Sequence, residues 1–202
     1  MADTSTDKPL AGKKIAFLVA PEGIEQAELT GPWEAVREAG AEPVLISTAP
    51  GTVQAFDHLT AADTFPVDVL VDDAAVSEYA ALVLPGGVAN PDALRTNLGA
   101  VKFVGQFAAS VRPVAAICHA PWTLVEAGVL PGRRLTSWPS LRTDLTNAGA
   151  EWVDEEVVVD RNGPGPLVTS RNPDDVPAFN AALLKLLTSS DEPATDRTGE
   201  SA

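Results

Sequence analysis

VAAICHAPW, residues 114–122, is the segment around which the rest of the chain is organised. Its apolar start predicts a buried strand that ends at Cys118, the only cysteine, and Pro121 then predicts the first turn of a helix. A strand-to-helix corner lifts the side chain at its tip out of the sheet. A lone cysteine is more often a small buried hydrophobe, but the corner, the adjacent His119 and the helix amides facing the sulfur favour a reactive thiol. We therefore predict that Cys118 is a nucleophile.

Apolar runs and a helical pattern alternate in the first part of the chain. Residues 14–20 and 43–47 are short apolar runs of the kind found in strands covered on both faces. The segment between them, residues 25–40, predicts a helix that Gly40 stops. This order is a βαβ unit, which requires a parallel sheet. The pattern indicates an α/β fold, in which ligands bind at the carboxyl ends of the strands.

A proline and two glycines, Pro85-Gly86-Gly87, follow a further predicted strand over residues 79–84. Glycine permits positive φ, so this turn can leave free amides at the carboxyl edge of the sheet. A nucleophilic cysteine needs a proton partner and donors for the oxygen that gains charge. His119 is the natural partner, although adjacent side chains at such a corner diverge. We expect the donors to be the backbone N–H of His119 and one from the Gly86-Gly87 turn, the alternative being that the glycines serve the turn alone.

Two carboxyl groups, Glu25 and Glu28, stand three residues apart at the start of the first predicted helix, and so on one helical face. Solvated carboxylates at a helix N-terminus are the simpler interpretation, for Glu25 in particular. Glu28 lies among apolar residues, where poor solvation would raise its pKa and let it donate a hydrogen bond to a Cys118 thiolate. His58 is expected in a loop or at the surface, with a place in the site as the alternative.

Several regions give weaker signals. Residues 51–65 predict short strands or an irregular excursion. Residues 151–153, 157–160 and 167–170 have the pattern of small antiparallel strands. No phosphate-binding glycine motif is present, and one cysteine with two histidines is a poor basis for a zinc site, so we expect no metal and no cofactor.

Length and charge restrict the organisation and the partners. With 202 residues, we expect one domain over residues 13–188, between disordered tails at 1–12 and 189–202. The net charge of −14 and the lack of a basic cluster argue against a nucleic-acid or membrane partner. A polar N-terminus without a secretory pattern and a lone cysteine predict a cytoplasmic protein.

The motifs AICHAP (116–121), LPGG (84–87) and EQAE (25–28), together with GRRLTSWPS (132–140) and NAGAEWVD (147–154), carry a family resemblance. The chain resembles the PfpI family of intracellular cysteine peptidases and general stress proteins, in the superfamily of the parkinsonism-associated protein deglycase, from about Lys14 to Leu187. The resemblance implies the class I glutamine amidotransferase-like fold, a three-layer αβα sandwich with a flavodoxin-like, mostly parallel sheet and a nucleophile elbow.

The resemblance also implies roles for individual residues. Cys118 matches the nucleophile, His119 its partner and Glu28 the superfamily's glutamate that contacts the cysteine, with Glu25 nearby. A third, acidic member comes in the family from a neighbouring subunit and matches Asp92, although the segment before it is one residue longer here and the family often has glutamate. The chain is therefore expected to form a homodimer or a higher homo-oligomer such as a hexamer.

Two departures from related sites limit what can be carried over. Trp138, expected beside the substrate, stands where the deglycase branch has a histidine. No histidine follows His119, whereas glutamine amidotransferases use a downstream histidine, which argues against glutamine hydrolysis.

The resulting functional expectation is a stress-response hydrolase that uses Cys118 on carbonyl substrates, namely a peptide or amide, a glycated protein, or a small aldehyde. The three substrate classes stay open because they share one covalent intermediate. The alternative is a non-enzymatic redox sensor or chaperone, in which Cys118 is oxidised to a sulfinate that Glu28 stabilises.

Overall fold

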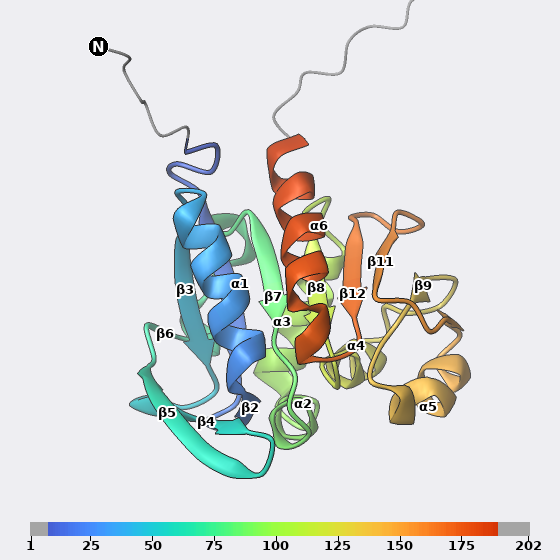
Figure 1. The fold of residues 1–202 in the computed structure, drawn as a ribbon, viewed down its shortest axis with the longest axis horizontal. Helices are drawn as coiled ribbons and strands as arrows, with labels where there is room; N and C mark the ends of the chain where they lie inside the picture. The colour runs from blue at the N-terminus through green and yellow to red at the C-terminus, as the bar shows by residue number, and fades with distance from the viewer. Residues whose placement is uncertain (1–7, 190–202) are drawn as a thin grey trace, which may run out of the picture.

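The computed structural model describes residues 8–189, which form an α/β fold of three layers (Figure 1). The strands of the central seven-stranded sheet are β1 (Lys14–Val19), β3 (Glu42–Ser47), β6 (Val69–Leu70), β7 (Ala81–Leu84), β8 (Val114–Ile117), β11 (Val157–Asp160) and β12 (Leu167–Ser170). The helices are α1 (Gln26–Glu38), α2 (Ala89–Leu94), α3 (Leu98–Ala108), α4 (Pro121–Glu126), α5 (Arg142–Asn147) and α6 (Val176–Ser189). Short 3-10 helices lie at Val71–Asp73, Val76–Glu78, Pro139–Leu141 and Pro173–Asp175.

The sheet order is β11-β12-β8-β7-β1-β3-β6, and every neighbouring pair is parallel except β11 with β12. The five strands β3-β1-β7-β8-β12, numbered along the chain, follow the order 2-1-3-4-5 of flavodoxin-like sheets. The predicted mostly parallel, flavodoxin-like sheet is confirmed. This topology brings the carboxyl ends of β1, β7 and β8 side by side.

Helices cover both faces of the sheet, which explains the continuous apolar runs of its strands. In Figure 1, α1 and α6 lie in front of the sheet, and α3 and α4 lie behind it. Along β1, Phe17 and its alternate neighbours pack with α1 and α6, whereas Ala16 and Leu18 belong to the core on the α3 and α4 side. Helix α1 ends at Glu38, two residues before the predicted stop at Gly40, which has φ +97°. The helix begins at Gln26, because Glu25 is the last residue of a strand.

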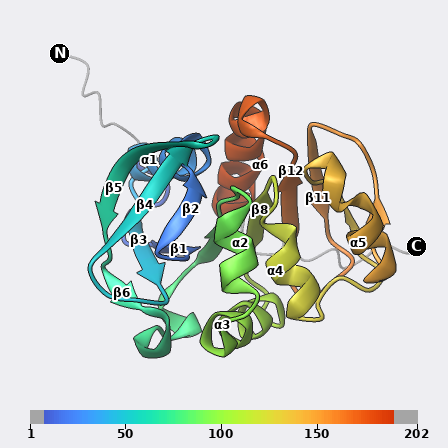
Figure 2. The same ribbon diagram turned by 90° about the horizontal axis from the view of Figure 1, so that it is seen from below.

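A second, three-stranded sheet lies at the carboxyl end of the large sheet. It consists of β2 (Glu22–Glu25), β4 (Thr52–Asp57) and β5 (Thr60–Pro66), so the weak signal over residues 51–65 is a hairpin. Strands β4 and β5 are antiparallel and leave His58 and Leu59 as a two-residue turn. Figure 2, a view from below, shows this sheet at the same end of the molecule as α2 and α4.

The small strands near the C-terminus are only partly as predicted. β11 and β12 are antiparallel, as expected, but β12 also pairs in parallel with β8 and so belongs to the large sheet. β10 (Glu151–Trp152) pairs in parallel with β9 (Arg134–Leu135), so the antiparallel prediction was wrong there. Two-residue strands carry too little alternation for the sequence to reveal their direction.

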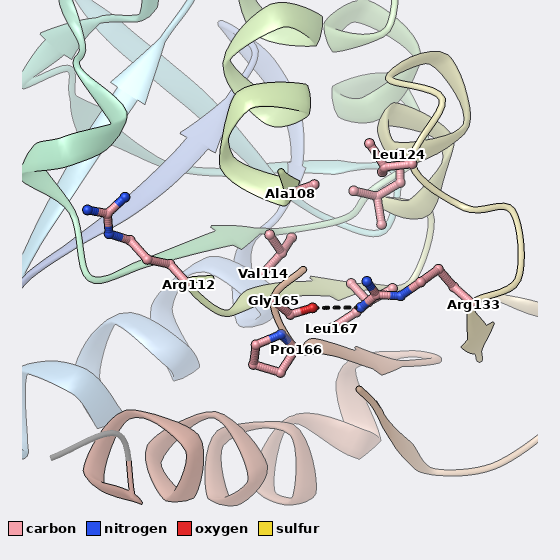
Figure 3. Close-up of a pocket in the computed structure, with 9 residues that line it drawn as sticks. Ala108, Arg112, Val114, Leu124, Arg133, Gly165, Pro166 and Leu167 are labelled. Atoms are coloured by element: carbon pink, nitrogen blue, oxygen red, sulfur yellow. Dashed lines mark hydrogen bonds between the residues drawn. The ribbon is translucent and has the colours of Figure 1, made fainter. Parts of the chain in front are cut away.

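Arg133 joins this peripheral region to the large sheet through buried polar contacts. Its guanidinium forms an ion pair with Asp160, and both side chains are almost fully buried. Its Nη2 donates a hydrogen bond of 3.0 Å to the carbonyl oxygen of Gly165 (Figure 3). A Cβ at Gly163 would lie 1.5 Å from Nη1, so the turn needs glycine there. The hollow next to Arg133 has a volume of only about 10 Å³, enough for about one water. Because no ligand fits there, the contacts of Arg133 serve the structure.

The predicted tails fall largely on residues outside the described part of the chain. Within it, Leu10 is fully buried and its N–H donates to the Ala39 carbonyl at 2.9 Å, so this residue is anchored to the fold, although its neighbours from 8 to 12 are exposed. A single apolar residue in a polar segment has no periodicity that could have revealed this. Over residues 8–189, no helix combines the length and the apolar character that crossing a membrane requires.

Candidate active site

Cys118 lies at the corner between β8 and α4 with φ +62°. Only His58 shares a positive φ among the non-glycine residues described, and this conformation is uncommon for residues with a Cβ. Three hydrogen bonds hold the corner: Cys118 N–H to the Ser170 carbonyl at 3.0 Å, Trp138 N–H to the Cys118 carbonyl at 2.9 Å, and Ala120 N–H to the Ile117 carbonyl at 3.0 Å. The backbone is therefore bent as a nucleophile elbow requires.

Two backbone amides face the Cys118 sulfur, those of Gly87 and His119. Burial raises the pKa of the Cys118 thiol, and hydrogen bonds from these two N–H groups lower it. Both predicted donors are thus at the sulfur. A Cβ on Gly87, which has φ +81°, would lie 2.0 Å from the Gly23 carbonyl oxygen, so the chain can approach this closely only with glycine.

Glu28 lies fully buried directly beneath the double-glycine turn. Its Oε2 accepts a 2.9 Å hydrogen bond from Gly86 N–H, and a Cβ on Gly86 would lie 2.4 Å from that oxygen and 2.7 Å from the Cys118 Cβ. The other oxygen, Oε1, is buried without a hydrogen bond of ordinary geometry in the described residues, while the carboxyl group is close enough to the Cys118 sulfur to share a proton with it.

Burial raises the pKa of Glu28 to about 8, with a further contribution from the Glu25 charge, and the hydrogen bonds with Cys118 and the glycine amides oppose this. An ionised Glu28 in turn raises the pKa of Cys118 by repulsion, in addition to burial. The two groups therefore titrate as a pair. With Glu28 protonated, the repulsion is absent, and donation of the carboxyl proton to the sulfur stays a prediction.

His119 contacts the sulfur directly, because its Nδ1 lies 3.1 Å from the Cys118 Sγ. The expectation that the two side chains diverge was wrong, since the positive φ of Cys118 turns both toward the same side. The imidazole stacks on Trp138, with ring centroids 5.6 Å apart and planes at 24°, and also contacts Trp122. Burial lowers the pKa of His119 to about 4, which favours the neutral ring at pH 7.

The cysteine opens into a cavity of about 180 Å³. The cavity is lined by Glu25, Glu28, His58, Leu59, Gly87, Val88, Cys118, His119, Trp138 and Pro173. Glu25, expected to be a solvated carboxylate, is buried in the wall, and Trp138 lies at the rim, where its expected place beside the substrate stays a prediction. Leu59, Val88 and Trp138 are all exposed, so the rim is largely apolar.

His58 lies in an exposed two-residue turn, as the preferred expectation had it, and it also lines this cavity, which was the alternative. Its sequence position gave no indication, because the hairpin that carries it was a weak signal. The same is true of Asn90, whose buried side chain accepts from Ala20 N–H at 2.7 Å and donates to the Pro85 carbonyl at 2.8 Å. Asn90 thus ties the end of β1 to the double-glycine turn.

Asp92 is not brought to the cysteine within one chain. It is exposed in the first turn of α2 and lines a separate hollow of about 370 Å³ together with Glu22. Its expected role in a neighbouring subunit's site stays a prediction.

Among the described residues, one group of side chains has the spacing of metal ligands. Ligand atoms of Glu25, Asp57 and His58 lie within 4.8 Å of one another, and two of the three residues are exposed.

A sequence profile of the DJ-1/PfpI family matches residues 13–186. The chain belongs to the DJ-1/PfpI family. Among curated family members, General stress protein 18 of Bacillus subtilis is 44% identical over 176 residues, which cover 87% of this chain and 98% of that protein. Protein/nucleic acid deglycase 2 of Escherichia coli is 43% identical over 175 residues, with the same coverage of 87% and 98%. Deglycase PfpI of Pyrococcus furiosus is 41% identical over 174 residues, covering 86% and 99%.

Solved structures of the DJ-1/PfpI family share the fold. A two-domain protein of Anabaena variabilis with DJ-1/ThiJ/PfpI-like and ferritin-like domains superposes with a TM-score of 0.80 at 32% identity, over 93% of this chain and 52% of that chain. This chain thus spans about half of the two-domain protein. DJ-1beta of Drosophila melanogaster gives a TM-score of 0.75 at 26% identity, covering 87% and 91%. The predicted family resemblance and fold are confirmed.

Proposed function

We propose that this protein is a stress-response cysteine hydrolase in which the Cys118 thiolate adds to the carbonyl carbon of its substrate. The observation that carries the proposal is the position of the Cys118 sulfur, which lies 3.1 Å from the His119 Nδ1 and faces the amides of Gly87 and His119. A nucleophile, a proton acceptor and two oxyanion donors therefore meet at one point, as acyl and carbonyl chemistry requires.

The reaction begins with transfer of the thiol proton to His119, which its neutral ring can accept. The sulfur then bonds to the carbonyl carbon, and the carbonyl oxygen takes the electron pair of the broken π bond. The N–H groups of Gly87 and His119 hold that oxyanion. Glu28, protonated up to about pH 8, donates to the sulfur and keeps a second negative charge away from it.

Protein or peptide carbonyl adducts and small aldehydes are the substrates we propose. The names of the relatives, two deglycases and a general stress protein, support this class. The cavity of about 180 Å³ is small for a folded peptide segment but large enough for a short carbonyl adduct. Its open, apolar rim suits a modified side chain presented from a protein surface.

We also propose that the protein acts in the cytoplasm as a homo-oligomer, with Asp92 completing the site of a neighbouring subunit. Asp92 is exposed on α2, at the same end of the sheet as the cysteine cavity, so a second copy could reach it. Light scattering together with activity at increasing dilution tests the shared site, because full activity in a demonstrated monomer rules it out.

A redox sensor is the second candidate function, favoured by one observation. A protonated Glu28 next to Cys118 can hydrogen-bond a sulfinate oxygen and so stabilise the oxidised form. Peroxide titration followed by mass spectrometry and a stress-protection assay separates this function from turnover: a sensor gains protection on oxidation, whereas an enzyme only loses activity.

The deciding experiment is a kinetic comparison of wild type and Cys118→Ser on methylglyoxal, a glycated peptide and an unfolded protein. We expect wild type to turn over at least one substrate and the variant to lose at least about 10³-fold in kcat/KM, with the melting temperature unchanged within a few degrees. Equal rates in both proteins would contradict the hydrolase proposal.

A further inference from the structure

His58 is tied to the buried Glu25 at the edge of the cysteine cavity. It occupies the first position of the two-residue turn between β4 and β5 and has φ +54°. Its N–H donates a 3.1 Å hydrogen bond to Glu25 Oε2, and its Nδ1 lies 3.5 Å from the same oxygen. One carboxylate oxygen therefore accepts the backbone hydrogen bond of a histidine that lines the same cavity as Cys118, and lies within ion-pair distance of its ring.

His119 alone cannot easily serve every proton transfer of a hydrolysis. Its Nδ1 is engaged with the sulfur at 3.1 Å, and Trp122 and Trp138 flank its ring. Burial is the cause that lowers its pKa to about 4, and no carboxylate in the described residues offsets it. Such a ring can accept a proton transiently, but its protonated form is scarcely populated at neutral pH. A hydrolase must also protonate a leaving group and take a proton from water.

We propose that His58 is a second catalytic residue, the acid and base that acts on the leaving group and on the attacking water, with Glu25 as the positioning residue that orients its ring. The proposal rests on the hydrolase function above and adds a residue to it. Histidine is the side chain best suited to exchange protons near neutral pH. An orienting carboxylate on one ring nitrogen, with the other free to meet substrate, is the arrangement of catalytic dyads in general.

The step balances without a further reactant. In the tetrahedral adduct that an amide or peptide carbonyl forms on Cys118, the oxyanion re-forms the carbonyl and the bond from carbon to the leaving nitrogen breaks. The electron pair of that bond takes a proton from the His58 imidazolium. The freed amine departs and a thioester stays on the sulfur. Water then adds to the thioester while neutral His58 takes its proton, the carbon–sulfur bond breaks, and Cys118 leaves as a thiolate. His58 is again protonated, and the net reaction is hydrolysis.

The charges around His58 fit this role. Glu25 comes from β2 and Asp57 from β4, and their carboxylate oxygens lie within 4.8 Å of the imidazole. Cys118, Glu28 and His119 are the titratable groups further inside the cavity. The His58 side chain is 80% exposed, so it can exchange protons with solvent and meet a substrate entering from outside.

The test uses two variants whose backbones suit a positive φ, His58→Asn and His58→Gly. Each is assayed on a peptide amide and on an unfolded protein, which contain the carbon–nitrogen bond that the step breaks. We expect kcat/KM to fall about 10²-fold or more, with the melting temperature and the rate of Cys118 alkylation by iodoacetamide close to wild type. Imidazole added to His58→Gly should restore activity with saturation, and its pH profile should follow the added base.

The controls separate the possible failures. Thr60→Ala, an exposed hairpin substitution beside the turn, should keep wild-type kinetics. Glu25→Gln should lower kcat more than it changes KM, because it misorients the ring. The inference is overturned if both His58 variants stay within about threefold of wild type while Cys118→Ser is inactive, or if activity falls but imidazole restores none of it. Absence of amide turnover in wild type overturns the His58 inference, and the hydrolase function falls with it only if methylglyoxal and the glycated peptide are not turned over either.

Discussion

Replacement of the buried Glu28 by glutamine should remove a large pH dependence of stability. Burial raises the pKa of this carboxyl group from 4.5 to about 8, so between these pH values the folded protein binds a proton that the unfolded chain has lost. Stability therefore decreases as pH rises, and the contribution is complete below about pH 4.5 and lost above about pH 8. At 1.36 kcal/mol per pKa unit, the loss approaches about 5 kcal/mol. The neutral amide keeps the acceptor for Gly86 N–H and cannot ionise.

Urea unfolding of wild type and Glu28→Gln at pH 5, 7 and 9 measures this difference directly. We expect similar free energies of unfolding at pH 5 and a variant that is several kcal/mol more stable than wild type at pH 9. The comparison is repeated in a Cys118→Ser background, which removes the titration of the thiol. Glu22→Gln, an exposed carboxylate on the neighbouring strand, is the matched control and should show no such trend. If the difference in free energy of unfolding between wild type and Glu28→Gln does not change with pH, Glu28 is not protonated in the folded protein.

Three further predictions concern other contacts. Gly87→Ala places a Cβ against a backbone carbonyl at positive φ, so it should destabilise the protein by at least about 2 kcal/mol in thermal unfolding and lower kcat. Arg133→Met leaves the buried Asp160 unpaired and should cost about 3–5 kcal/mol in urea unfolding, most of which a second change, Asp160→Leu, recovers. Trp138→Ala exposes the His119 ring and should raise its pKa from about 4 toward the usual value in an NMR titration.

The parts of the fold that the sequence predicted are those in which a local pattern and the tertiary environment agree. The fully buried run of β1, the Gly40 stop and the corner at Cys118 each have a local cause, namely burial on two faces, positive φ and a strand followed by Pro121. The parallel pairing of β9 with β10 and the contact of Leu10 with Ala39 join residues that are far apart in the sequence. No local sequence pattern could therefore predict them.

The candidate site divides in the same way. Three features of the site were predictable because each differs from the sequence around it. Cys118 is a thiol at a strand-to-helix corner, Glu28 is a carboxyl group among apolar residues, and Gly86 and Gly87 directly follow a strand. His119 was predicted as the partner of Cys118, but its direct contact with the sulfur was not, because that contact depends on the backbone conformation at the corner. His58 was not either, since only the hairpin pairing carries it to the cavity.

Over residues 8–189, the three-stranded sheet shares no strand pairing with the seven-stranded sheet. The large sheet and its loops carry the thiol and its oxyanion donors, while the tip of the β4–β5 hairpin contributes to the mouth of the cavity. We therefore expect changes in the length or sequence of this hairpin to leave the register of the large sheet intact. The turn of the hairpin can therefore be exchanged without changing the large sheet. We expect other turns grafted at this position to change the range of adducts that the cavity accepts, provided that each retains a side chain able to transfer a proton.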